Sequence, residues 1–70
     1  MNFSEKAKIR IEHWIHHNLD HVEDYEAFAT ELETAGKSES ARHIREMGRL
    51  LSRSNDHLKE ALRHLGADSG

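Results

Sequence analysis

The chain has 70 residues, of which 33% are charged, and its net charge is −3 when the histidines are neutral. It contains no cysteine and no proline, so disulfides and thiolate metal sites are excluded and the strongest helix breaker is missing. The acidic balance argues against a nucleic-acid partner. No apolar run approaches the roughly 18 residues of a membrane span, and the N-terminus lacks a signal-peptide pattern. We therefore expect no membrane partner, and a cytoplasmic protein that forms one small domain over residues 1–70.

A first helix is predicted over about residues 3–35. Asn2 followed by Glu5 has the form of a capping box at its start. Two rows with heptad spacing form its apolar stripe, namely Ile11, Asn18, Tyr25 and Leu32, and Trp14, His21, Phe28 and Ala35. A third row widens this stripe beyond what one neighbouring helix would cover, and it consists of Ile15, Val22 and Ala29.

A second helix is predicted over about residues 38–65. Gly36 suits the left-handed position that follows a helix, and Ser38 suits the N-cap of the next one. Gly66 is the expected stop, which leaves residues 67–70 as a frayed tail. Two strict heptad rows run along this helix, namely Ala41, Gly48, Asn55 and Leu62, and Ile44, Leu51, Leu58 and Leu65.

The fold class predicted from these elements is all-α. A short turn makes the two helices an antiparallel hairpin, and the wide stripe of the first helix favours a homodimer in which two hairpins form a four-helix bundle. Residues 12–33 hold seven acids and no Lys or Arg, whereas residues 37–64 hold seven Lys or Arg against four acids. This favours pairing of the two helices, within a chain or across the dimer. The expected core or dimer anchors are Trp14, Tyr25, Phe28, Leu51 and Leu58.

A polar layer is predicted in the middle of the bundle. Folding at Gly36 places residue i near residue about 73 − i, so Asn18 faces Asn55 and His21 faces Ser52. Buried amides need hydrogen bonds, and a core Asn is a known means of fixing helix register. We therefore expect Asn18, Asn55 and Ser52 to form a structural layer that supports neighbouring groups.

Four histidines fall within nine residues, at His13, His16, His17 and His21. His17 and His21 are one helical turn apart, so both imidazoles can reach a single ion. His13 and Asp24 are candidate further ligands, and this nitrogen and oxygen set suits Zn, Ni, Co or Fe. An alternative stays open, in which His21 is a core histidine that hydrogen-bonds across the polar layer.

Catalytic motifs are missing from the sequence. It contains no Glu-x-x-His, no His-Glu-x-x-His, no glycine-rich phosphate loop and no nucleophile elbow, so we do not expect an enzyme. The leading hypothesis is a small metal-binding protein for sensing, storage or delivery. Two alternatives are an interaction module that dimerises or docks on another helical protein, and an assembly that responds to pH through its histidines.

The run from His13 to His21, HWIHHNLDH, resembles the signature H-W-I-x-H-N-x-x-H of short helical-hairpin domains from bacteria and archaea that have no assigned function. In that group the second helix carries an Asn followed by leucines, as Asn55, Leu58, Leu62 and Leu65 do here. The resemblance covers nearly the whole chain. It implies that His13, His17 and His21 form one set with Asn18 and Asn55 beside it, and it implies no reaction.

Overall fold

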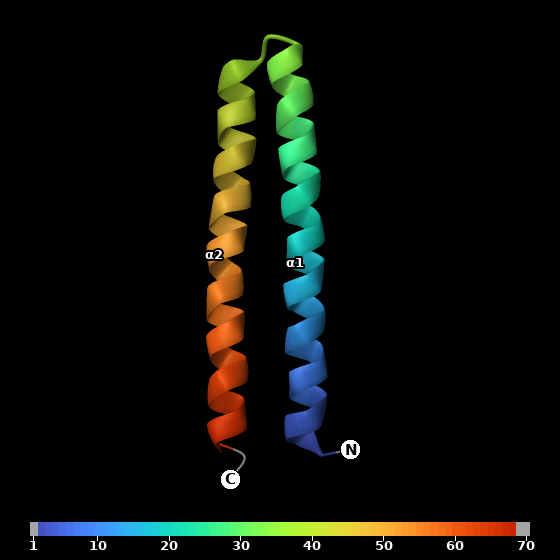
Figure 1. Cartoon of the computed structure of the whole chain (residues 1–70), viewed down its shortest axis with the longest axis vertical. Coiled ribbons are helices and arrows are strands. Elements are labelled where there is room, and N and C mark those ends of the chain that lie inside the picture. The colour runs from blue at the N-terminus through green and yellow to red at the C-terminus, as the bar shows by residue number, and fades with distance from the viewer. Residues whose placement is uncertain (1, 69–70) are drawn as a thin grey trace.

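The computed structural model describes residues 2–68, and it consists of two antiparallel helices joined by a short turn (Figure 1). Helix α1 spans Phe3–Thr34 and helix α2 spans Ser38–Asp68. The molecule measures 54 × 17 × 9 Å, and the start of α1 and the end of α2 lie at the same end of the rod. No strand occurs within residues 2–68, which confirms the all-α hairpin. Neither helix contains an apolar stretch long enough to cross a membrane in this part of the chain.

The start of α1 is capped as predicted. Asn2 has extended backbone angles, with φ −81° and ψ 174°, and its Oδ1 accepts a hydrogen bond from the Glu5 backbone N–H at 2.9 Å. This bond satisfies one of the backbone donors that a helix leaves free in its first turn.

The turn between the helices is a Schellman motif. Lys37 donates its backbone N–H to the Leu32 carbonyl at 2.8 Å, and Gly36 donates to the Glu33 carbonyl at 2.9 Å. Gly36 has a φ of +79°, which is the left-handed conformation predicted for it. The predicted N-cap at Ser38 is wrong by one residue, because the Lys37 carbonyl already accepts the first bond of α2, from Ala41 at 3.0 Å.

The predicted stop at Gly66 is also wrong, because α2 continues through Gly66 to Asp68. Gly36 is the glycine with positive φ in the described residues, so Gly66 does not adopt the left-handed conformation that would end the helix. No proline follows to force a stop. Of the predicted frayed tail, residues 69–70 lie outside the described residues.

The helices meet along one stripe of each. The stripe of α1 consists of Ile11, Ile15, Asn18, Val22, Tyr25, Ala29 and Leu32, which are buried or half-buried. The stripe of α2 consists of both predicted heptad rows, from Ala41 to Leu65. The second core row of α1 is therefore Ile15, Val22 and Ala29. The predicted row of Trp14, His21, Phe28 and Ala35 is rotated out of this contact, since Trp14 is 47% exposed and Phe28 is 50% exposed.

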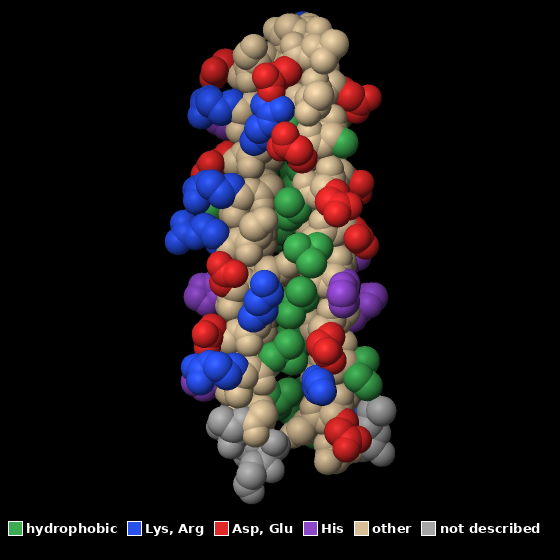
Figure 2. Space-filling model, in the orientation of Figure 1, with side chains coloured by type: hydrophobic (Ala, Val, Ile, Leu, Met, Phe, Trp, Pro, Cys, Tyr) green, Lys and Arg blue, Asp and Glu red, His purple; other side chains and the backbone are tan. Residues whose placement is uncertain are grey.

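Opposite charges pair across the two helices along one side of the hairpin. The Arg45 guanidinium donates to both carboxylate oxygens of Glu26 at 3.2 Å and also bonds to Glu33. Figure 2 shows mostly acidic side chains along α1, and basic side chains interspersed with acidic ones along α2, on the face drawn there. The predicted attraction between the helices thus exists within the chain. Exposed pairs of this kind contribute about 0.2–1 kcal/mol each, so they favour the orientation more than the stability.

Candidate functional site

Four aromatic rings follow one edge of α1 at intervals of four residues, and we call His13, His17, His21 and Tyr25 the ring ladder. The ring centroids of His13 and His17 are 6.1 Å apart in a stacked arrangement. His17 and His21 follow at 4.4 Å with perpendicular planes, and His21 stacks on Tyr25 at 5.9 Å. Side chains four residues apart lie one turn above each other on a helix, so the ladder follows directly from the spacing in the sequence.

The closest approach within the ladder joins His17 and His21. Their Nε2 atoms are 2.9 Å apart, so one ring donates a hydrogen bond and the other accepts it. Two nitrogen ligands bound to one ion at about 2.0–2.1 Å would have this separation at an angle of about 90°. His17 is exposed and His21 is half-buried, so solvent reaches the pair. The distance between the two nitrogens is therefore compatible with a shared metal ion.

The other predicted ligands do not join this pair. His13 contacts His17 through its ring, and Asp24 is exposed without a hydrogen bond or ion pair among the described residues. Within residues 2–68, no group of three or more His, Asp or Glu side chains is placed to hold one ion. Asp24 follows His21 by three residues but His17 by seven, or about 10 Å along the helix axis, so its separations from the two rings differ. A single chain thus offers two imidazoles and an incomplete coordination sphere.

The polar layer next to the pair is formed by two asparagines. Asn18 donates its side-chain N–H to Asn55 Oδ1 at 2.8 Å, and Asn55 Nδ2 donates to the Ile15 carbonyl at 3.2 Å. Asn55 is only 2% exposed, and no buried side-chain nitrogen or oxygen in the described residues lacks a partner. The predicted register, in which paired residue numbers sum to about 73, is confirmed by this contact.

Ser52 and His21 do not belong to the buried layer. Ser52 is exposed, because it follows Leu51 by one residue and is therefore turned about 100° away from the core. His21 bonds to His17 on its own helix, so its partner is not across the layer. The layer has a positional effect, since directing Asn18 toward α2 places His17 and His21 on the flank of α1.

The predicted anchors divide into two groups. Leu51 and Leu58 are half-buried between the helices, and Tyr25 packs on Gly48, where an added Cβ would lie 3.8 Å from the Tyr25 Cβ. Trp14 and Phe28 are exposed, so they do not anchor the core of a single hairpin.

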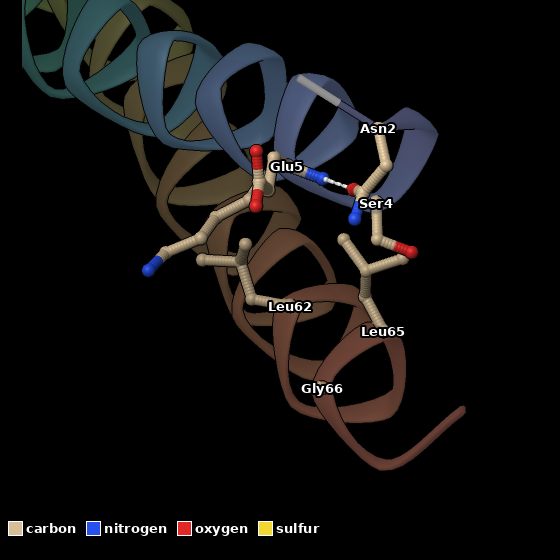
Figure 3. A pocket seen from close by; sticks show the side chains of 7 residues that line it. Asn2, Ser4, Glu5, Leu62, Leu65 and Gly66 are labelled. Atoms are coloured by element: carbon tan, nitrogen blue, oxygen red, sulfur yellow. Dashed lines mark hydrogen bonds between the residues drawn. The ribbon is translucent and has the colours of Figure 1, made fainter. Parts of the chain in front are cut away.

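A hollow at the open end of the hairpin is separate from the ring ladder (Figure 3). Its volume is about 500 Å³, and Leu62 and Leu65 of α2 lie across from Ser4 and Glu5 of α1. It contains no histidine and no cluster of ligands, and sequence reasoning did not single it out. A shallower depression of about 540 Å³ lies on α1 between Ile9 and Trp14.

A family model described as "Domain of unknown function (DUF8180)" matches residues 7–65. The chain belongs to this family. The match includes the turn, the Asn18–Asn55 pair and the whole ring ladder of this DUF8180 domain. The expected resemblance to a family without an assigned function is thus confirmed at that level. No curated protein and no solved structure matches the chain.

Proposed function

We propose that this DUF8180 domain is a small cytoplasmic metal-binding protein that acts as a homodimeric four-helix bundle in metal sensing, storage or delivery. The observation that carries the proposal is the 2.9 Å separation between the Nε2 atoms of His17 and His21. Both rings belong to one rigid helix, so the pair is already arranged for a shared ion. A preorganised pair loses less conformational entropy on binding than two free side chains would.

The chemistry of the surroundings favours a divalent transition metal. Imidazole nitrogens with carboxylate or water oxygens suit zinc, nickel, cobalt or iron, and the chain has no thiolate to select softer ions. The seven acids of residues 12–33 and the absence of Lys or Arg there create a negative field along α1. Such a field raises the local concentration of cations and speeds their association.

Metal binding is tested by titrating Zn²⁺ or Ni²⁺ into protein purified without a histidine tag. At a free metal concentration of one hundred times the dissociation constant, binding stabilises the fold by about 2.7 kcal/mol. For a domain of this size we expect a rise in Tm of about 10–20 °C. The double variant His17→Ala/His21→Ala should lose this rise.

A matched control removes two other imidazoles. His43 and His57 are exposed on α2 and are not one turn apart, so His43→Ala/His57→Ala should keep the full rise. An equal rise in the His17→Ala/His21→Ala variant, or none in the unmodified chain, would contradict metal binding at this pair.

A second candidate function is a metal-independent interaction module that docks on another helical protein. The Asn18–Asn55 pair supports it, because a satisfied polar pair fixes helix register without any ion. In this case chelators leave the Tm unchanged. His21→Leu then stabilises the fold, since an apolar side chain replaces a half-buried polar one.

A further inference from the structure

On one side of the hairpin, no ion pair joins the two helices among the described residues, and apolar side chains are exposed there. Trp14 and Phe28 each precede a core residue of α1, and Met47 precedes the core position Gly48 of α2. In an antiparallel helix pair, the residues that precede core residues lie on one side of the pair in both helices. The residues that follow core residues lie on the opposite side, and these include Glu26, Glu33 and Arg45. Met47 is 42% exposed, and the neighbouring Leu50 is 53% exposed. We call Trp14, Phe28, Met47 and Leu50 the apolar face.

The exposed area is large for the mass of the chain. The accessible surface is 5402 Å² at 8.1 kDa. A compact monomer of that mass would expose about 4,500 Å², or about 900 Å² less. A stable interface covers about 800 Å² on each partner. Among residues 2–66, only Ala29 and Ala41 are fully buried apolar residues, so a single hairpin has a very small core. Both comparisons indicate that a partner covers the apolar face.

The α1 residues on this side form a row that can pair with the same row of a second, antiparallel copy. It consists of Arg10, Trp14, His17, His21, Asp24, Phe28 and Glu31, at alternating intervals of four and three residues. In an antiparallel contact between two copies of α1, centred on His21, each residue meets a complementary one. Arg10 faces Glu31, Trp14 faces Phe28, His17 faces Asp24, and His21 faces itself.

The corresponding row of α2 has no charged residue that could pair with the charged residues of α1. It consists of Ser40, His43, Met47, Leu50, Ser54, His57, Ala61 and His64, so it carries no Lys, Arg, Asp or Glu. If α1 lay on the partner's α2 instead, Arg10, Asp24 and Glu31 would face uncharged residues. Charge complementarity therefore favours contact of α1 with α1.

We propose that a second copy of this chain covers the apolar face with its α1 antiparallel to the first, and that Asp24 of each copy completes the metal site of the other. This inference rests on the proposed function. His17 and His21 supply two nitrogens, and the second copy supplies the carboxylate that the described residues of one chain do not place beside this pair. Two His and one carboxylate form a three-ligand set that leaves a position open for water or cargo exchange. The dimer then holds two equivalent sites, or one ion per chain.

A complementation experiment tests this exchange of ligands. Asp24→Asn keeps the histidine pair, and His17→Ala/His21→Ala keeps the carboxylate, so neither homodimer has a complete site. We expect each variant alone to bind Zn²⁺ more than about tenfold more weakly than the unmodified chain. When the two variants are unfolded and refolded together, half of the dimers are mixed, and each mixed dimer has one complete site. The mixture should therefore regain about a quarter of the tight sites.

The outcomes separate the two proposals. If Asp24→Asn binds Zn²⁺ as tightly as the unmodified chain, or the mixture regains no tight sites, the inference is overturned while metal binding at His17 and His21 stands. If the unmodified chain itself binds no Zn²⁺, the proposed function fails, and the completed site fails with it.

The pairing of the helices is tested without metal by cross-linking, which the cysteine-free sequence makes simple. His21→Cys places a thiol at the proposed two-fold axis, so mild oxidation should give a covalent dimer. Ser52→Cys places an exposed thiol on the side of the Arg45 ion pairs, so it should form no covalent dimer under the same conditions. Cross-linking of Ser52→Cys without His21→Cys, or a monomeric unmodified chain in sedimentation, would overturn the arrangement.

Discussion

The side-chain amide of Asn18 donates to the side-chain oxygen of Asn55 at 2.8 Å, across the interface of the two helices. Asn55 then donates to the Ile15 carbonyl, so both polar groups of this almost fully buried side chain are satisfied. The contact fixes the axial register of α2 against α1 and the rotation of α1 about its own axis. It thereby decides that His17 and His21 lie on the flank of the hairpin.

Replacing one asparagine should cost more than replacing both. Asn55→Leu leaves the Asn18 amide without its partner, and an unsatisfied buried donor costs about 1–3 kcal/mol. The double variant Asn18→Leu/Asn55→Leu should recover most of that loss or exceed the original stability, because an apolar pair can replace a polar one. Urea denaturation at one fixed protein concentration measures the three free energies of unfolding. Purely additive losses would argue against coupling of the two amides.

Gly48→Ala should stabilise the protein. The added Cβ would lie 3.8 Å from the Tyr25 Cβ and 3.9 Å from its Cδ2, which is ordinary van der Waals contact. Alanine gains up to about 1 kcal/mol over glycine inside a helix. Thermal unfolding measures the effect, and Gly48→Leu is the matched control, because its larger side chain overfills the same space and should destabilise by about 1–3 kcal/mol. A lower Tm for Gly48→Ala would show that the helices cannot accept even a methyl group here.

Gly36→Ala should destabilise the turn. The φ of +79° at Gly36 costs a residue with a Cβ about 1–2 kcal/mol, although no atom lies within 4 Å of an added Cβ. Asparagine tolerates this conformation better, so Gly36→Asn should lose less stability than Gly36→Ala. Denaturant unfolding of the two variants side by side provides the comparison. Equal losses in both would mean that backbone conformation is not the cause.

The Glu46 carboxylate should titrate at lower pH than an isolated glutamate. The Arg49 guanidinium donates from its Nε to Glu46 Oε2 at 2.9 Å, and this hydrogen bond lowers the pKa of Glu46 below its ordinary value. Because the pKa is lower in the folded state, the pair stabilises the fold above the pKa of unfolded glutamate. This contribution is lost as the pH falls through the folded pKa.

Carboxyl NMR titration of Glu46 measures this pKa directly. In Arg49→Gln the pKa should rise toward the ordinary value, whereas Lys59→Gln, a charge change elsewhere on α2, should leave it in place. Because both side chains are exposed to solvent, we expect little change in overall stability. A Glu46 pKa that is the same in the unmodified chain and in Arg49→Gln would contradict the assigned cause.

Local signals predicted most of the fold correctly. The cap at Asn2, the left-handed Gly36 and the alignment of Asn18 with Asn55 all follow from residue types and short spacings. The errors at Ser38 and Gly66 concern helix ends, where a single added or missing hydrogen bond moves the boundary. The spacing of His17 and His21 predicted their contact, because residues four apart on a helix are neighbours in any tertiary setting.

The sequence by itself determined two helices, their turn and their register, since each depends on interactions within a few residues or on the length of the connection. Only the tertiary structure decided which apolar row of α1 meets α2. The rows that begin at Trp14 and Ile15 differ by one residue, or about 100° of rotation, and both have heptad spacing. The narrow stripe of α2 has room for only one of these two rows. Burial of Asn18 against Asn55 selects the row that contains Ile15. That rotation exposes Trp14 and Phe28 and places the histidine pair beside them on the flank of α1.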